Sequence, residues 1–318
     1  MIDEGEETST ASFGSLTGVI PPMTATVELG LASRRLLRLI PNTRGNWLVG
    51  ANLFRALRGA RLARLSLRHG DFHTDLRLDL GDPAQFTMVR SGHFDLMTAA
   101  IVHSALRSGD TFVDVGANWG YFTWIASHRV GLDGFVLAIE PNRAAYRRLL
   151  DTLGRGRLVN VMTAQSAVYD RVGVRVSLLK RRLHQTTSSY VREWQTGGKR
   201  SVLTSTVDYL TSKMASGPVR LLKVDTEGAE LPVMQGAQRL LTESKPLVVL
   251  EVSRYCARFG YTMDQLYKYM SAMGYSCAYS IDDAPGDWRV SGPLTTVVEG
   301  QILFRHPDGD CPLPFDQS

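Results

Sequence analysis

The chain has few cysteines and no apolar run long enough to cross a membrane. Its three cysteines, Cys256, Cys277 and Cys311, form no CxxC pair and are odd in number, which argues against a disulfide scaffold or a zinc cluster. The apolar runs fall short of the roughly 20 residues that a membrane-spanning helix needs. The acidic N-terminus lacks the apolar segment of a secretory signal. These absences predict a protein of a reducing, cytoplasmic compartment.

Acidic residues are missing where basic residues gather. The net charge is +5, and residues 31–70 contain nine arginines and no aspartate or glutamate, whereas residues 1–30 carry five acids and no lysine or arginine. One interpretation is a basic surface for an anionic partner such as a lipid or a phosphorylated substrate. We favour amphipathic helices with solvated arginines, because no aromatic platform or nucleic-acid motif accompanies the charge. No nucleic-acid partner is therefore predicted, and peripheral contact of residues 31–70 with a membrane stays open.

The chain is long enough for one substantial domain and an appendage. It has 318 residues, of which 44% are hydrophobic. We predict a disordered tail over residues 1–25, a helical Arg-rich extension over 26–95 that caps the substrate site, and the main domain over 96–318. A short hairpin is expected at residues 71–86, where apolar and polar residues alternate. Homodimer formation is left open.

Strands and helices alternate along the main domain. Strands are predicted at residues 111–114, 135–139, 159–163, 172–179, 200–205, 220–224, 247–250, 275–279 and 301–305. Helices are predicted at residues 95–106, 121–128, 143–153, 230–241 and 264–273. This alternation predicts an α/β fold: a mostly parallel, Rossmann-like sheet of seven strands with helices on both faces.

The most informative stretch runs from Asp114 to Gly120. A buried strand ends there in an aspartate, and Gly116 and Gly120 lie in the turn to the next helix. Glycine permits a left-handed bend and lets a ligand press against bare backbone. Such turns at the carboxyl ends of parallel strands bind nucleotide-like ligands. Since Asp114 suits a cation better than a pyrophosphate, we predict S-adenosylmethionine as the cofactor.

Four predicted strands end in acidic residues, and the carboxyl ends of parallel strands share one edge of a sheet. These residues are Asp114, Glu140, Asp225 and Glu251. Glu140 lies 24 residues after Gly116, about where an acid meets ribose hydroxyls in a βαβ unit. An ionised carboxylate can accept both hydrogens of that diol.

Three further polar residues are candidates for the cofactor site. Asn118 either holds the glycine turn or reaches the amino-acid end of the cofactor, and Gln165 and Ser166 follow the third strand, where the edge of an adenine would lie. The predicted cofactor-binding residues are Asp114, Gly116, Asn118, Gly120, Glu140, Gln165, Ser166 and Asp225.

Three carboxylates crowd the segment from Lys223 to Glu230. Like charges this close raise at least one pKa or recruit a cation. Asp225 is our first candidate for the general base that an alcohol needs, followed by Glu227 and then His184. A metal held by Asp225 with Glu227 or Glu251 is an alternative, but no histidine joins it, and we predict no metal. Lys223 is expected to form an ion pair.

These motifs, in this order, resemble the FkbM-type S-adenosylmethionine-dependent methyltransferases. The resemblance covers residues 90–253 and is carried by the runs at 114–120, 139–142, 188–189, 205–210, 222–230 and 250–252. It implies a class I methyltransferase fold that usually acts on oxygen, with Asp114, Gly116 and Gly120 at the methionine end and Glu140 at the ribose. Thr226 departs from the family pattern, in which valine or isoleucine is commoner.

The sequence thus predicts an S-adenosylmethionine-dependent methyltransferase, most consistent with O-methylation of a hydroxyl on a specialised metabolite, a sugar or a lipid-linked glycan. One alternative is a non-catalytic binding or scaffold protein on the same fold at a membrane surface. The other is an NAD-dependent oxidoreductase, which is disfavoured because position 118 is asparagine where the Gly-x-Gly-x-x-Gly fingerprint needs glycine.

Overall fold

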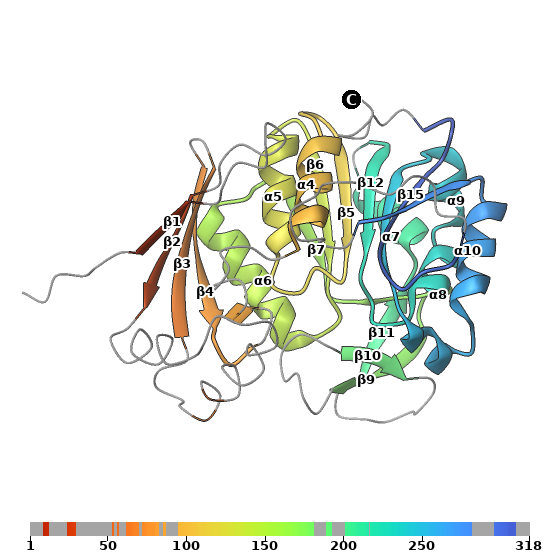
Figure 1. Ribbon diagram of the computed structural model, residues 1–318, viewed down its shortest axis with the longest axis horizontal. Helices are drawn as coiled ribbons and strands as arrows, with labels where there is room; N and C mark the ends of the chain where they lie inside the picture. Colours follow the sequence, from red (N-terminus) through yellow and green to blue (C-terminus); the bar gives the residue numbers. More distant parts are fainter. Residues whose placement is uncertain are drawn as a thin grey trace, which may run out of the picture. The chain divides into compact units, whose positions relative to one another are not determined.

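The computed structural model describes most of the chain beyond residue 94 and short stretches before it (Figure 1). The described ranges are 9–12, 24–29, 62–69, 72–82, 85–86, 95–180, 189–192, 201–215, 217–281 and 296–309, with the single positions 53 and 56. The chain divides into two compact units, one containing residues 1–94 and the other containing most of residues 95–318. Among the described residues, no helix has both the length and the apolar character needed to cross a bilayer.

The first unit contains an antiparallel sheet of four strands in sequence order. They are β1 (Ser9–Ser12), β2 (Thr24–Leu29), β3 (Leu62–His69) and β4 (Phe72–Asp79). The prediction of helix is therefore wrong for residues 62–68, where apolar and polar residues alternate with the period of two that suits a strand. The predicted disordered tail includes β1. The prediction of a hairpin within residues 71–86 is wrong, because the described part of that range contains the single strand β4, which pairs with β3 before it. Most of the Arg-rich segment lies outside the described residues.

The second unit is built on a seven-stranded sheet in the order β14-β15-β13-β12-β5-β6-β7. The strands are β5 (Thr111–Val115), β6 (Phe135–Ile139), β7 (Val161–Ala164), β12 (Val219–Val224), β13 (Leu247–Val252), β14 (Cys277–Ser280) and β15 (Gly300–Arg305). The five strands from β13 to β7 are parallel, and β15 runs antiparallel to both of its neighbours. This confirms the predicted α/β fold class with its mostly parallel sheet.

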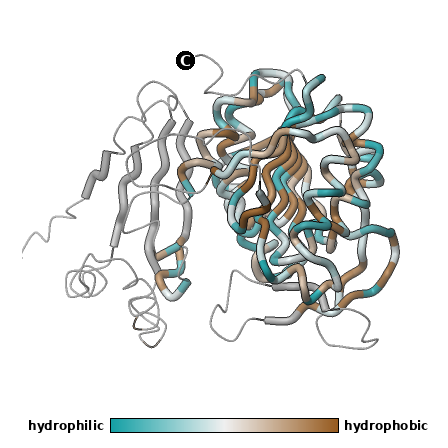
Figure 2. Tube along the Cα trace, turned by 45° about the vertical axis from the view of Figure 1, so that its right-hand side comes forward, coloured by the Kyte–Doolittle hydropathy of each residue, from teal (hydrophilic) through white to brown (hydrophobic). Residues whose placement is uncertain are grey.

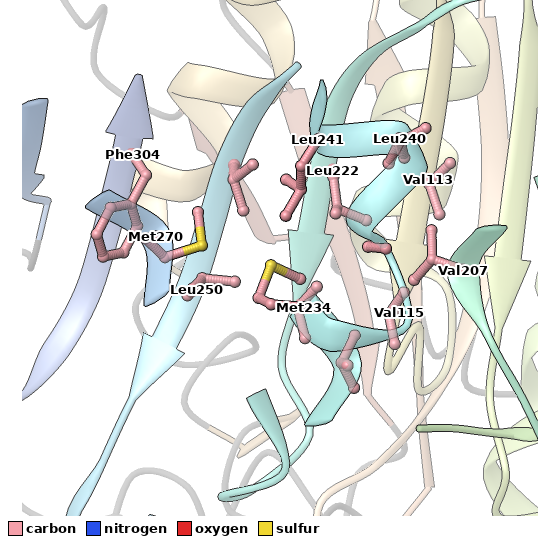
Figure 3. Packing of buried hydrophobic residues seen from close by; sticks show 14 of the residues in the cluster. Val113, Val115, Val207, Leu222, Met234, Leu240, Leu241, Leu250, Met270 and Phe304 are labelled. Atoms are coloured by element: carbon pink, nitrogen blue, oxygen red, sulfur yellow. The ribbon is translucent and has the colours of Figure 1, made fainter. Parts of the chain in front are cut away.

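Helices cover both faces of this sheet. One face packs against α7 (Val207–Met214), α8 (Glu230–Gln235), α9 (Gln238–Glu243) and α10 (Met263–Ala272). On that face, apolar side chains of the strands, Val113, Val115, Leu222 and Leu250 among them, meet those of the helices in the main core (Figure 3). The sheet strands form the most hydrophobic part of the unit (Figure 2).

The opposite face carries α4 (Leu96–Ala105), α5 (Tyr121–Val130) and α6 (Arg143–Gly156). Leu149 and Leu153 of α6 pack against Ala138 of β6. Ala138 is paired in register with Asp114, so Asp114 also points to this face. A single helix was predicted at residues 230–241, but Gly236 separates α8 from α9. A Cβ there would come within 2.2 Å of the Tyr169 carbonyl oxygen, so only glycine fits this close approach.

A small second sheet follows β7 in the chain, in the order β10-β9-β11-β8. Its strands are β8 (Ala167–Val168), β9 (Arg175–Lys180), β10 (Ser189–Arg192) and β11 (Ser201–Ser205). The strands predicted at residues 172–179 and 200–205 correspond to β9 and β11. A six-residue 3₁₀ helix, η2 (Arg254–Phe259), follows β13.

Candidate functional site

The four predicted acidic residues lie at the carboxyl ends of four adjacent strands. Asp114 and Glu251 are the next-to-last residues of β5 and β13, and Glu140 and Asp225 directly follow β6 and β12. The chain runs from β5 to β6 on one side of β5, and β12 lies on the other side. This reversal of strand order is a topological switch point, where open α/β sheets bind their ligands.

Gly116 forms the turn at this switch point. Its φ of 80° is left-handed, and a Cβ at this position would lie 2.0 Å from the carbonyl oxygen of Asp225. The backbone N–H groups of Gly116 and Ala117 donate to the Ile139 carbonyl at 2.9 and 3.0 Å. Only glycine lets the ends of three neighbouring strands approach this closely.

The turn continues through two more left-handed residues. Asn118 has a φ of 51°, and Gly120, at the N-cap of α5, has a φ of 91°. A Cβ on Gly120 would lie 2.7 Å from Leu149 Cδ1, so this glycine lets α6 pack against the start of α5. Gly116 and Gly120 therefore have different tasks, one at the site and one in helix packing.

A buried lysine lies between two of the acids. Lys223 Nζ is 3.6 Å from Asp114 Oδ1 and 3.6 Å from Asp225 Oδ2. The Lys223 and Asp114 side chains are 2% and 0% exposed, whereas that of Asp225 is 35% exposed. Asp225 is thus the carboxylate of this group that a ligand can reach.

The surroundings of Lys223 and Asp114 set their proton affinities. Burial raises the pKa of Asp114, and the Lys223 ammonium and a 2.7 Å hydrogen bond from Thr123 Oγ1 act against that rise. Burial by itself lowers the pKa of Lys223, but the carboxyl groups of Asp225 and Asp114 reverse this and leave it raised. Lys223 therefore stays a cation, and its ammonium also lies 5.0 Å from the centre of the Phe122 ring.

Glu140 fastens the turn to the next strand. Its two oxygens accept hydrogen bonds from the backbone N–H groups of Asn118 at 2.9 Å and Asn142 at 2.7 Å. Burial raises the pKa of Glu140 to about 7, despite these two hydrogen bonds. Each carboxyl oxygen keeps a second lone pair, so Glu140 can still accept hydrogens from a ligand.

The sequence left two roles open for Asn118, namely holding the glycine turn and reaching the cofactor, and its contacts bear on both. Its backbone N–H holds the loop against Glu140, but its side-chain oxygen Oδ1 is buried and has no hydrogen-bond partner within the described part of the chain. A buried polar atom without a partner is costly, and a bound ligand is one way to satisfy it.

Asp225 and Glu251 form a second close pair. Val224 and Leu250 are partners in the parallel ladder, so the residues after them are neighbours at the edge. The charge of Asp225, followed by burial, raises the pKa of Glu251 well above its usual value. Glu227 adjoins this pair in a left-handed conformation, with a φ of 58°.

Glu230 organises the loop that follows Asp225. Its Oε1 accepts hydrogen bonds from Thr226 N, Thr226 Oγ1 and Gly228 N at 3.2, 3.0 and 3.0 Å. The Tyr261 hydroxyl lies 3.3 Å from Glu230 Oε2 and donates to the Gly228 carbonyl at 2.8 Å. Burial raises the pKa of Glu230 to about 7. Glu230 is thus a first-turn residue of α8 that also holds the loop.

The remaining predicted residues are placed as follows. Gln165 is exposed after β7, and Ser166 Oγ donates to the Leu203 carbonyl of β11 at 2.9 Å. His184 lies outside the described residues. Within the described ranges, no three histidine, cysteine, aspartate or glutamate side chains are arranged to hold a metal ion.

Sequence reasoning underrated one residue and missed two. Lys223 was expected to form an ion pair, but not to lie between two acids, although a lysine within the apolar run of β12 was the available signal. Thr123, on the first turn of α5, was not singled out. Tyr261 was also missed, and no local pattern could have found it, because it reaches Glu230 from 31 residues away.

The fold and its acidic edge define a Rossmann-like protein with class I methyltransferase architecture. The Methyltransferase FkbM domain family matches residues 114–277, just over half of the chain. The chain therefore belongs to the FkbM family of S-adenosylmethionine-dependent methyltransferases. This confirms the family resemblance, and with it the prediction of the cofactor class. No curated protein matches the chain in sequence.

Three solved structures illustrate the similarity. The FkbM methyltransferase from Methylobacillus flagellatus KT is 16% identical, with 62% of this chain and 43% of that chain covered and a TM-score of 0.43. Fibrillarin from Aeropyrum pernix with bound S-adenosyl-L-methionine is 13% identical, with coverages of 66% and 74% and a TM-score of 0.39. A SAM-dependent O-methyltransferase from Thermotoga maritima is 10% identical, with coverages of 69% and 68% and a TM-score of 0.38. Similarities this low do not bear on the chemistry of this chain.

Proposed function

We propose that this protein methylates a hydroxyl group of a small-molecule or glycan acceptor, such as a specialised metabolite, a sugar or a lipid-linked glycan. The observation that carries the proposal is the group of carboxyls around the Gly116 turn, of which Asp225 is partly exposed and the others are buried or nearly so. Membership of the FkbM family supports it. The preference for oxygen rests on the family resemblance.

The residues at this edge fit an adenosyl sulfonium cofactor. The Gly116 turn offers backbone without a side chain, Glu140 has free lone pairs for a diol, and the buried Asn118 Oδ1 has no partner in the described residues. The acidic edge favours a cation over a pyrophosphate. When bound, S-adenosylmethionine supplies an electrophilic methyl group on a positively charged sulfur.

Asp225 is the residue best placed to act on an acceptor. An alcohol is a weak nucleophile, so a base has to take its proton as its oxygen is alkylated. The Asp225 carboxylate is exposed enough to receive that proton, while Lys223 holds it from the buried side at 3.6 Å. Glu227, in the same loop, is the second candidate. The rest of the protein's contribution is alignment and exclusion of water.

The cofactor assignment is tested by thermal denaturation with S-adenosylmethionine, S-adenosylhomocysteine and NAD as separate ligands. A ligand at a hundred times its Kd stabilises a protein by about 2.7 kcal/mol, which gives a clear rise in Tm. We expect a rise with both adenosyl-sulfur ligands and none with NAD. A rise with NAD alone would instead support the oxidoreductase alternative, and no rise with any of the three would support a non-catalytic protein.

The acceptor atom is tested with radiolabelled methyl donor and matched pairs of polyhydroxylated acceptors. In each pair, one member has a hydroxyl at the position where the other has an amine. We expect label to enter the member that has the hydroxyl. Label that enters only amines would contradict O-methylation while leaving the cofactor assignment intact.

A further inference from the structure

The family resemblance implies that Asp114 lies at the methionine end of the cofactor, but this carboxyl is completely buried. Its Oδ2 accepts a 2.7 Å hydrogen bond from Thr123 Oγ1 of α5, and its Oδ1 lies next to the equally buried Lys223 ammonium. Lys223 in turn contacts Asp225, which is partly exposed. A ligand at the Gly116 turn can therefore reach Asp225, whereas Asp114 and Lys223 are shielded from it.

The Lys223 ammonium is shared equally between the two acids. Its Nζ lies 3.6 Å from Asp114 Oδ1 and 3.6 Å from Asp225 Oδ2. A charge-assisted hydrogen bond from an ammonium to a single carboxylate is shorter, about 2.7–2.9 Å. Asp225 and Asp114 also raise the pKa of Lys223 more than Asp95 and Glu251 do. One positive charge thus faces two carboxyls, so Asp225 keeps part of its negative charge uncompensated.

Thr123 maintains this division of the ammonium. Burial raises the pKa of Asp114, and the Lys223 ammonium and the hydrogen bond from Thr123 act against that rise and keep Asp114 ionised. Without this hydrogen bond, Asp114 would take up a proton more readily. Lys223 would then be drawn toward Asp225, because opposite charges attract more strongly at a shorter separation. The negative charge of Asp225 would be compensated from the buried side.

We propose that Asp114 is a positioning residue and not a contact of the cofactor: by sharing the Lys223 ammonium, it keeps the negative charge of Asp225 available to the sulfonium of S-adenosylmethionine. Thr123 supports this role by holding Asp114. The backbone of Asp225 borders the turn that the cofactor approaches, since a Cβ on Gly116 would lie 2.0 Å from the Asp225 carbonyl oxygen. The inference rests on the proposed function in taking S-adenosylmethionine as the ligand, and it does not depend on the acceptor atom.

The test compares S-adenosylmethionine with S-adenosylhomocysteine, whose sulfur is neutral. Calorimetric titration gives both Kd values, and the Kd of S-adenosylhomocysteine divided by that of S-adenosylmethionine measures the preference for the sulfonium. Asp225→Asn should lower this ratio, because it removes the charge that favours the sulfonium. Thr123→Val replaces no charged group, and it should lower the ratio roughly threefold to tenfold. A purely structural role of Thr123 would weaken the binding of both ligands equally and leave the ratio unchanged.

Three further variants serve as controls. Thr123→Ser retains the hydroxyl and should keep the wild-type ratio. Thr211→Val removes a hydroxyl that is also buried but lies in α7, on the opposite face of the sheet, where it bonds to carbonyls of its own helix; the ratio should not change. Lys223→Met should raise the ratio, because no ammonium then compensates the charge of Asp225. A general loss of packing does not predict opposite changes in Thr123→Val and Lys223→Met.

Two measurements decide how Thr123 and Asp114 act. If Thr123 acts through Asp225, the ratio in the double variant Thr123→Val, Asp225→Asn should equal the ratio in Asp225→Asn alone. Asp114→Asn should leave the Kd of S-adenosylhomocysteine within about twofold of the wild-type value. Direct contact of Asp114 with the amino-acid end, which both ligands share, would instead weaken the binding of both.

The proposal is overturned by an unchanged ratio in Asp225→Asn, by an equal loss for both ligands in Thr123→Val, or by an equal loss for both in Asp114→Asn. Asp225→Asn and Asp114→Asn give their answers even if Thr123→Val does not fold. Each of these outcomes leaves the proposed function intact, because the wild type still binds both ligands. If the wild type binds neither, the proposed function itself fails, and this inference fails with it.

Discussion

Lys223 and Asp114 are partners in the parallel ladder between β12 and β5, and their charged atoms lie 3.6 Å apart in the interior of the protein. The pair projects from the face of the sheet that α5 covers, and Thr123 of that helix adds a hydrogen bond to Asp114. The exposed Asp225 is therefore held by a buried cation that is itself fixed by a second acid. This arrangement couples the stability of the sheet to the geometry of the site.

Replacing Lys223 by methionine should lower the free energy of unfolding by about 3–5 kcal/mol, because removing one partner of a buried pair leaves the other charge uncompensated. Urea unfolding measures this loss. Lys245→Met is the control, since Lys245 and Asp308 form a more exposed pair whose side chains are 32% and 70% exposed, and its loss should stay within about 1 kcal/mol. Equal losses in the two variants would show that the burial of Lys223 does not increase its contribution to the free energy of unfolding.

Gly116→Ala should destabilise the protein more than Gly109→Ala, by at least about 2 kcal/mol. Both glycines have left-handed backbones, with φ values of 80° and 88°, so both substitutions carry a backbone cost of about 1–2 kcal/mol. Only at Gly116 would the new methyl collide with backbone, the Asp225 carbonyl that follows β12, whereas nothing lies within 4 Å of a Cβ at Gly109. Thermal denaturation of both variants separates the two costs, and similar losses would contradict the close approach of Gly116 to Asp225.

Glu140 should make stability fall as the pH rises. Its pKa is about 7 in the folded protein against an ordinary value of 4.5, so the folded state binds more protons between these values. The resulting stability is complete below about pH 4.5 and is lost as the pH rises through about 7, to a total of about 3 kcal/mol. The free energy of unfolding, measured with urea across this pH range, should depend less on pH in Glu140→Gln than in the wild type. Glu243→Gln, at a side chain that is 65% exposed, should match the wild type. If the free energy of unfolding changed equally with pH in both variants, the raised pKa of Glu140 would be contradicted.

Thr226→Val should cost about 1 kcal/mol, because the Thr226 hydroxyl donates to the buried Glu230 carboxyl at 3.0 Å. The two backbone N–H donors to the same oxygen remain, so the loop should keep its conformation. Thr242→Val is the control, since its hydroxyl bonds only to exposed carbonyls of its own helix. A neutral Thr226→Val variant would show that the valine common in the family serves equally well here.

Much of this architecture could be predicted from local sequence. Each strand of the parallel sheet is an apolar run, and the acids after β6 and β12 mark where two of these runs end. The glycine turn was evident because Gly116 and Gly120 lie between an acidic strand end and the start of the next helix. The sheet of the first unit was predicted less well, since the period of two in residues 62–68 was taken for a helix. The roles of Gln165, Ser166 and His184 stay predictions.

The sequence by itself determined the fold class, the family and the four acids at one edge of the sheet, because strand periodicity, turn residues and motif order are local properties of the chain. Only the tertiary structure decided that Lys223 lies between Asp114 and Asp225 and that Tyr261 reaches Glu230. The physical reason is that ion pairing and proton affinity depend on burial and on neighbours from other strands and helices, and a linear pattern does not specify either.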